Sequence, residues 1–136
     1  MKALFFLVAL TFSLLGSDVA KSLNYHTDYN TALKAALKAD KPLMLVQVTD
    51  YCPWCRKLEK NTLSDEDIKK IVSEKFIPLL VLRDKSSFPE KFRTPRIPTI
   101  FFIEAKTEEG YWESIGYVKK DEMLTNLETA LELYNE

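Results

Sequence analysis

The chain has 136 residues, of which 46% are hydrophobic and 29% charged, as in an ordinary folded domain. This length supports one domain with a substantial core and is too short for two. The 19 basic and 20 acidic residues give a net charge of −1, so nothing in the balance calls for nucleic acid or an anionic membrane as partner.

The N-terminal segment differs from the rest and is typical of an export signal. Lys2 supplies a positive start, and residues 3–15 form an apolar run broken only by Thr11 and Ser13. A run of this length suits a signal peptide and is too short to span a bilayer comfortably as a helix. We therefore expect residues 1–20 to be a signal peptide and residues 21–136 to form one exported domain. An uncleaved N-terminal anchor is the alternative, and it too would deliver the domain outside the cytoplasm.

Hydrophobic periodicity predicts a helix, a strand and a second helix in the first half of the domain. The first helix is expected around residues 29–37, with Thr27 or Asp28 as its cap. Residues 43–48 form a nearly continuous apolar run, which is typical of a strand buried on both faces. A second helix is expected over residues 53–61, because proline is well tolerated in the first turn of a helix.

The second half of the domain is predicted to hold a helix, three strands and a closing helix. Ser64, with an acidic residue three positions later, is typical of a capping box at the start of the first of these helices. A βαβ unit followed by a ββα unit predicts an α/β fold, with a mixed central β-sheet and helices on both faces. The strands are expected at residues 77–82, 99–103 and 111–115, and the closing helix at residues 124–134.

Cys52, Pro53, Trp54 and Cys55 form a CxxC motif between the predicted buried strand and the helix that follows it. The pair closes too small a loop to stabilise the fold much by constraining the unfolded chain, so chemistry explains it better than a structural role. The partial positive charge at a helix N-terminus favours a thiolate, which is the attacking species in disulfide exchange. We predict that Cys52 is the more exposed, attacking nucleophile, and that Cys55, one helical turn away, is the resolving thiol.

Other roles for the two cysteines fit the sequence less well. A zinc site needs about four ligands, whereas the chain has one CxxC and a single histidine, His26. A c-type haem needs a histidine directly after the second cysteine, where this chain has Arg56. We predict no metal and no cofactor, and two buried, inert thiols remain as the alternative.

Pro98 stands out because it directly precedes a run that is typical of a central strand, where proline is normally disfavoured. A cis peptide bond in a tight turn would resolve this conflict. An ordinary trans proline at the first residue of a strand is the alternative, and the sequence leaves both open.

These features together resemble the thioredoxin superfamily, and above all its small bacterial periplasmic members. The residues that carry the likeness are Tyr51 to Cys55 after a strand, and Ile97, Pro98 and Thr99 at the start of a later one. The likeness covers about Tyr25 to Tyr134. It implies a thioredoxin fold, a periplasmic location, and a cis Pro98 that abuts the two sulfurs.

The same resemblance implies how a substrate is bound. The backbone of Ile97 would pair with a substrate peptide in the manner of an added strand. Tyr51, Trp54 and Ile97 would line an apolar surface for that peptide. Phe92 is a further candidate for this surface, with simple core packing as the alternative.

In one respect the chain departs from thioredoxins proper. They carry a buried aspartate six residues before the first cysteine, and this chain has Val46 there. Gln47 and Asp50 lie nearby, but neither is an obvious replacement. Glu59, one turn past Cys55, is a candidate substitute for the missing acid.

The sequence therefore predicts a thiol-disulfide oxidoreductase that reduces or isomerises disulfides of exported proteins, kept reduced by a membrane-bound electron donor. Strong oxidants commonly stabilise their thiolate with a histidine between the cysteines, whereas Pro53 and Trp54 carry no charge. Two alternatives remain: a dithiol oxidant of exported proteins, and a non-enzymatic binding module that retains the fold.

Overall fold

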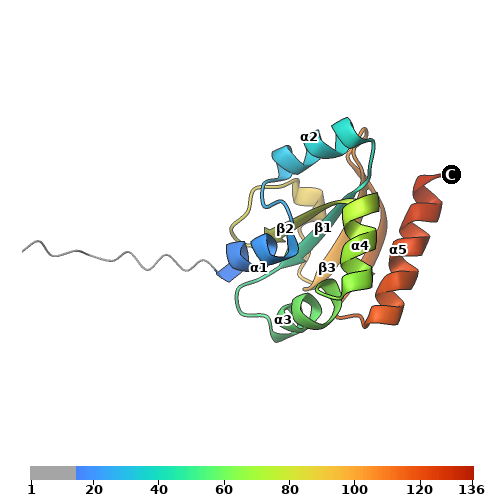
Figure 1. The fold of residues 1–136 in the computed structure, drawn as a ribbon. Coiled ribbons are helices and arrows are strands. Elements are labelled where there is room, and N and C mark those ends of the chain that lie inside the picture. The colour runs from blue at the N-terminus through green and yellow to red at the C-terminus, as the bar shows by residue number, and fades with distance from the viewer. Residues whose placement is uncertain (1–14) are drawn as a thin grey trace, which may run out of the picture.

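The computed structural model describes residues 15–136, which fold around a four-stranded β-sheet with the strand order β2-β1-β3-β4 (Figure 1). The central strand β1 (Leu43–Val48) pairs in parallel with β2 (Ile77–Leu82). On its other side β1 pairs antiparallel with β3 (Thr99–Glu104), which forms a hairpin with β4 (Glu109–Ile115). The predicted mixed sheet of an α/β fold is confirmed.

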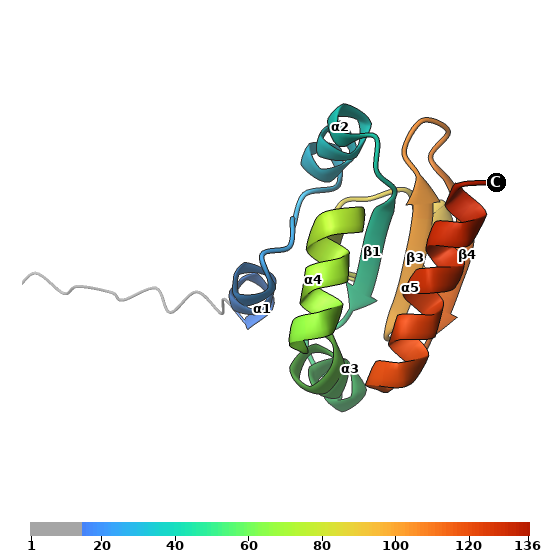
Figure 2. The same ribbon diagram turned by 45° about the vertical axis from the view of Figure 1, so that its right-hand side comes forward.

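Helices cover both faces of this sheet, so that β1 is buried on both sides (Figures 1 and 2). Alternate β1 side chains enter two separate apolar layers, with Met44 and Val46 in one and Leu43 and Leu45 in the other. The helix α2 (Tyr29–Ala39) packs on the second layer. The first layer is covered by α1 (Leu15–Leu23), α3 (Pro53–Leu58), α4 (Glu66–Lys75) and α5 (Lys120–Tyr134).

The helix starts agree with the sequence in one case and correct it in another. Asp28, one of the two caps predicted for α2, accepts a hydrogen bond from the Thr31 N–H at 2.8 Å. The prediction that Ser64 caps α4 is wrong, because Asp65 accepts the bonds from Asp67 N–H and Ile68 N–H. The Ser64 hydroxyl turns back into the preceding helix and donates to the Lys60 carbonyl.

The helix that follows the CxxC motif continues as one turn of π-helix, Glu59–Leu63, after α3 ends. Its wider turn is visible in the hydrogen bond from Ser64 N–H to the Glu59 carbonyl at 3.2 Å. The predicted helix over residues 53–61 is therefore present, with a change of pitch that hydrophobic spacing does not predict.

The helix α1 crosses the boundary at residue 20 that the sequence suggested between an export signal and the domain. Within α1, Ala20 is fully buried and Val19 packs against the first apolar layer. The Ala20 carbonyl accepts a hydrogen bond from Tyr25 N–H at 2.8 Å. Most of the predicted apolar run, residues 3–15, lies outside the described residues. Within residues 15–136, none of the helices is long and apolar enough to cross a membrane.

We predict that a chain beginning at Lys21 is less stable than one beginning at Asp18. Removing Val19 and Ala20 takes their contacts from the core and should lower the free energy of unfolding by about 2 kcal/mol. Urea denaturation of the two chains measures the difference. Equal unfolding midpoints would show that α1 adds nothing to the fold, and that the domain begins at residue 21.

Candidate active site

The topology of the sheet places the CxxC motif and the Ile97–Pro98 turn at the same end of two neighbouring strands. Because β1 and β3 are antiparallel, the end of β1 lies beside the start of β3, and Gln47 is directly opposite Thr99. The CxxC motif follows the end of β1, and Ile97 and Pro98 precede the start of β3. Cys52 and Ile97 both pack, partly buried, against the apolar layer that contains Cys55.

Cys52 and Cys55 form a disulfide with their Cα atoms 5.2 Å apart. Cys52 is partly exposed and Cys55 is fully buried, which agrees with the predicted difference between them. Cys52 occupies the N-cap of α3, where its Sγ accepts a hydrogen bond from the Cys55 N–H at 3.1 Å. Pro53 stands in the first turn, where its missing N–H costs no helical bond. The helix N-terminus is therefore directed at the more accessible sulfur.

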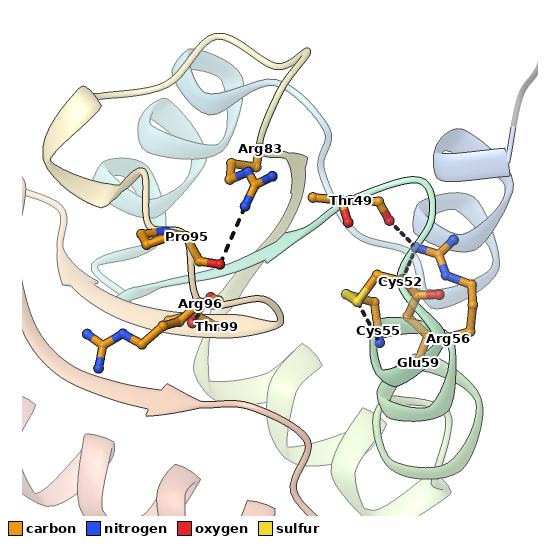
Figure 3. Close-up of a disulfide and its surroundings, with 9 residues drawn as sticks. All are labelled: Thr49, Cys52, Cys55, Arg56, Glu59, Arg83, Pro95, Arg96 and Thr99. Atoms are coloured by element: carbon orange, nitrogen blue, oxygen red, sulfur yellow. Dashed lines mark hydrogen bonds and ion pairs between the residues drawn. A yellow bond between two sulfur atoms is a disulfide. The ribbon is translucent and has the colours of Figure 1, made fainter.

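A hydrogen bond from Arg56 fixes the loop that leads into the motif (Figure 3). The Arg56 guanidinium donates to the Thr49 carbonyl at 3.0 Å and lies 3.2 Å from a carboxylate oxygen of Glu59. These contacts direct Arg56 toward Thr49 and Glu59, and so away from a role beside Cys52. Asp50, in the same loop, forms an ion pair with Lys85.

Glu59 is a buried acid beside the motif, with its side chain 5% exposed. Burial raises the pKa of the Glu59 carboxyl above its ordinary value, and the neighbouring Arg56 only partly opposes this. Val46, at the position where thioredoxins carry an aspartate, is fully buried among apolar side chains. Glu59, the first residue of the π-helical turn after α3, is thus a buried acid one turn beyond Cys55.

The peptide bond between Ile97 and Pro98 is cis. Pro98 is buried, and its carbonyl accepts a hydrogen bond from Gly116 N–H at 2.7 Å, which ties it to the end of β4. Gly116 has a φ of +83°, a conformation that side chains rarely adopt. Thr99 closes the turn from within, by a hydrogen bond from its hydroxyl to the Arg96 carbonyl.

Exposed aromatic residues lie on both sides of Cys52 in the sequence. Tyr51 is 98% and Trp54 56% exposed. The ring of Tyr117 lies 5.7 Å from that of Trp54, and the Lys57 ammonium lies 5.0 Å and 4.8 Å from the two ring centres. Tyr117 was not among the site residues predicted from the sequence. The glycine before it marks a turn after the last strand, and that turn is the local signal that could have drawn attention to it.

Phe92 does not contribute to this surface. It is 4% exposed, packs against Phe101 with the ring centres 5.4 Å apart, and lies close enough to Gly110 to restrict any larger residue there. The core-packing alternative for Phe92 is confirmed. Within residues 15–136, there is no cluster of three or more potential metal-ligating side chains.

A family model described as a thioredoxin-like domain matches residues 29–131. Among curated proteins, mouse Anterior gradient protein 3 is 32% identical over 72 residues, which make up 51% of this chain and 44% of that protein. A protein of Borreliella burgdorferi is 29% identical over 107 residues, or 79% of this chain and 46% of that one. The chain thus spans less than half the length of these relatives.

Solved structures show the same fold. A thioredoxin from Thermus thermophilus superposes with a TM-score of 0.68 at 23% identity, covering 79% of this chain and 86% of that one. The oxidised C-terminal domain of Neisseria meningitidis DsbD superposes with a TM-score of 0.61 at 20% identity, covering 80% and 98%.

The raised pKa of Glu59 leads to a prediction about stability and pH. Above the ordinary value of 4.5, the folded protein holds a proton at Glu59 that the unfolded chain has lost. Stability therefore falls as the pH rises from 4.5 to the folded-state pKa. Glu59→Gln has no such proton, so we expect the variant to become progressively more stable than the wild type across that interval.

Urea unfolding of both proteins at several pH values measures this difference. Glu74→Gln, which changes an exposed glutamate on α4, is the control and should show no such trend. A difference between wild type and Glu59→Gln that does not vary with pH would contradict the raised pKa.

Proposed function

Because the chain belongs to the family of thioredoxin-like domains, we propose that it is an exported thiol-disulfide oxidoreductase that reduces or isomerises disulfides in exported proteins. The observation that carries this proposal is the asymmetry of the cysteine pair. Cys52 is accessible at the start of α3 and Cys55 is buried behind it. The Cys52 sulfur can form a mixed disulfide with a client, and the Cys55 sulfur is placed to displace the client from Cys52.

The reaction follows from this asymmetry. In the reduced pair, the Cys52 thiolate attacks one sulfur of a client disulfide, forms a mixed disulfide and releases the other client sulfur as a thiolate. Cys55 then loses its proton and attacks the Cys52 sulfur, which re-forms the Cys52–Cys55 disulfide and releases the second client thiolate. The proton of Cys55 and one from solvent, which Cys52 released when it ionised, end on the two client thiols. The client gains two electrons, and the pair loses them.

Client binding is proposed to use the surface around Cys52. Ile97 precedes the cis proline, and its backbone would pair with an extended client segment as an added strand. Tyr51 and Trp54 offer exposed aromatic area on the side of the motif. The Tyr117 ring and the Lys57 ammonium lie against the Trp54 ring, and these contacts would restrain it before a client binds.

The location and electron supply are inferred from the N-terminal sequence. The apolar run after Lys2 supports export to the periplasm, where clients with disulfides occur. A reductant that works there must itself be re-reduced, so the proposal requires a membrane-bound donor of electrons.

We predict opposite outcomes for the two cysteine variants. Cys52→Ala should abolish the reduction of insulin by dithiothreitol that the wild type catalyses, because the attacking thiolate is gone. Cys55→Ala should retain attack but not release, and should accumulate mixed disulfides with client proteins. Non-reducing gel electrophoresis detects them, with the double variant Cys52→Ala/Cys55→Ala as the control that forms none. Full insulin-reducing activity in Cys52→Ala would overturn the assignment.

We predict that the pair is reducing in character. Pro53 and Trp54 carry no charge, and Arg56 is engaged with Thr49 and Glu59, so no side chain of the motif supplies the charge that strong oxidants use. Equilibration with glutathione buffers gives the reduction potential. A value more oxidising than about −150 mV, toward the strong-oxidant end of the range, would favour the dithiol-oxidant alternative. Failure of the reduced pair to exchange with any disulfide would favour the binding-module alternative.

A further inference from the structure

Gln47 is a polar side chain in the middle of the molecule. It lies in the central strand β1 and is 0% exposed, in a strand whose other members are apolar. Burying an amide group is unfavourable unless both its donor and its acceptor find partners. Its presence there therefore needs a reason that hydrophobic packing does not supply.

Both ends of the Gln47 amide bind the backbone of one distant segment. Gln47 Nε2 donates to the Phe92 carbonyl at 2.7 Å, and Gln47 Oε1 accepts from the Thr94 N–H at 3.2 Å. A backbone carbonyl needs a donor and a backbone N–H needs an acceptor, so only one orientation of the amide satisfies both. The Gln47 side chain thus attaches both ends of the short segment 92–94 to the sheet.

That stretch leads directly to the residues proposed to bind clients. Thr94 is three residues before Ile97, and Gln47 is itself opposite Thr99 in the strand register. Residues 92–99 therefore form a loop that both begins and ends at Gln47. Two longer hydrogen bonds join this loop to the segment after β2: Arg83 reaches the Pro95 carbonyl at 3.5 Å on the exposed surface (Figure 3), and Arg93 donates to the Ser86 carbonyl at 3.3 Å.

We propose that Gln47 is a positioning residue that holds the Ile97 backbone ready to pair with an extended client peptide. This inference rests on the proposed function. A loop that must first be ordered weakens client binding by the cost of ordering it, whereas one already fixed does not. A small disulfide without a peptide backbone makes no use of Ile97, so its reaction with Cys52 should be independent of Gln47.

The experiment compares wild type with Gln47→Met, which keeps approximate volume and removes both hydrogen bonds. The reduced proteins are assayed with a disulfide-linked synthetic peptide and with hydroxyethyl disulfide. We expect KM for the peptide to rise about tenfold, which corresponds to about 1.4 kcal/mol. We expect kcat, and the rate constant with hydroxyethyl disulfide, to change less than about twofold, a shift of under 0.5 kcal/mol.

Ser114→Ala is the matched control. Ser114 is also buried in the sheet and accepts a hydrogen bond from Asn126 at 3.0 Å, but on β4 and toward α5. Its loss should lower stability without raising KM for the peptide. If both variants raise KM equally, or if Gln47→Met slows the two substrates equally, Gln47 has only a structural role and the inference is overturned.

A measurement on the wild type keeps the inference testable if Gln47→Met does not fold. The Thr94 amide should exchange with solvent as slowly as the amides of β1, because its hydrogen bond is to a buried side chain. Rapid exchange of Thr94 would show that the loop is not held and would overturn the inference. A wild-type protein that reduces neither substrate would instead overturn the proposed function.

Discussion

The antiparallel pairing of β1 with β3 is the constraint on which the candidate site depends. Neighbouring strands lie about 5 Å apart, so whatever follows the end of β1 must lie close to whatever precedes the start of β3. The pairing of Gln47 with Thr99 defines the register at this end of the two strands. A slip of one residue would turn β1 over and exchange its two apolar layers, each of which is packed against helices. The burial of β1 on both faces therefore determines which loops meet.

Strand pairing brings the two loops together but does not order them, because loop backbone lacks the regular hydrogen bonds of paired strands. Buried or partly buried side chains take over that task here. Arg56 binds the Thr49 carbonyl ahead of the cysteines, and Gln47 binds the backbone of Phe92 and Thr94 ahead of the cis proline. Arg56 belongs to α3 and Gln47 to β1, and each side chain binds the backbone of a loop. The two loops are therefore restrained relative to these regular elements. The ion pair between Arg56 and Glu59 links α3 to the first residue of the π-turn.

The sequence predicted those parts of the molecule whose cause is local. β1 and β2 appear where apolar runs placed them, and α2 begins after the predicted cap at Asp28. The predicted start of α4 is wrong because Ser64 and Asp65 both carry capping side chains. In the structure Asp65 caps α4, and the Ser64 hydroxyl donates to the Lys60 carbonyl instead. The helix α1 was not predicted, because its residues followed an apolar run that suggested a leader.

The other features that the sequence did not predict depend on contacts between residues far apart in the chain, which no local sequence pattern indicates. Tyr117 faces Trp54 because the loop after β4 is fastened to the helix after the cysteines, where the buried Thr62 hydroxyl donates to the Val118 carbonyl at 2.7 Å. The π-turn that contains Thr62 widens the helix next to that loop. Lys57, on the same helix as Trp54, then lies against both aromatic rings. The aromatic surface beside Cys52 is thus built from two chain segments held by one buried hydroxyl, which explains why a polar threonine occupies a fully buried position.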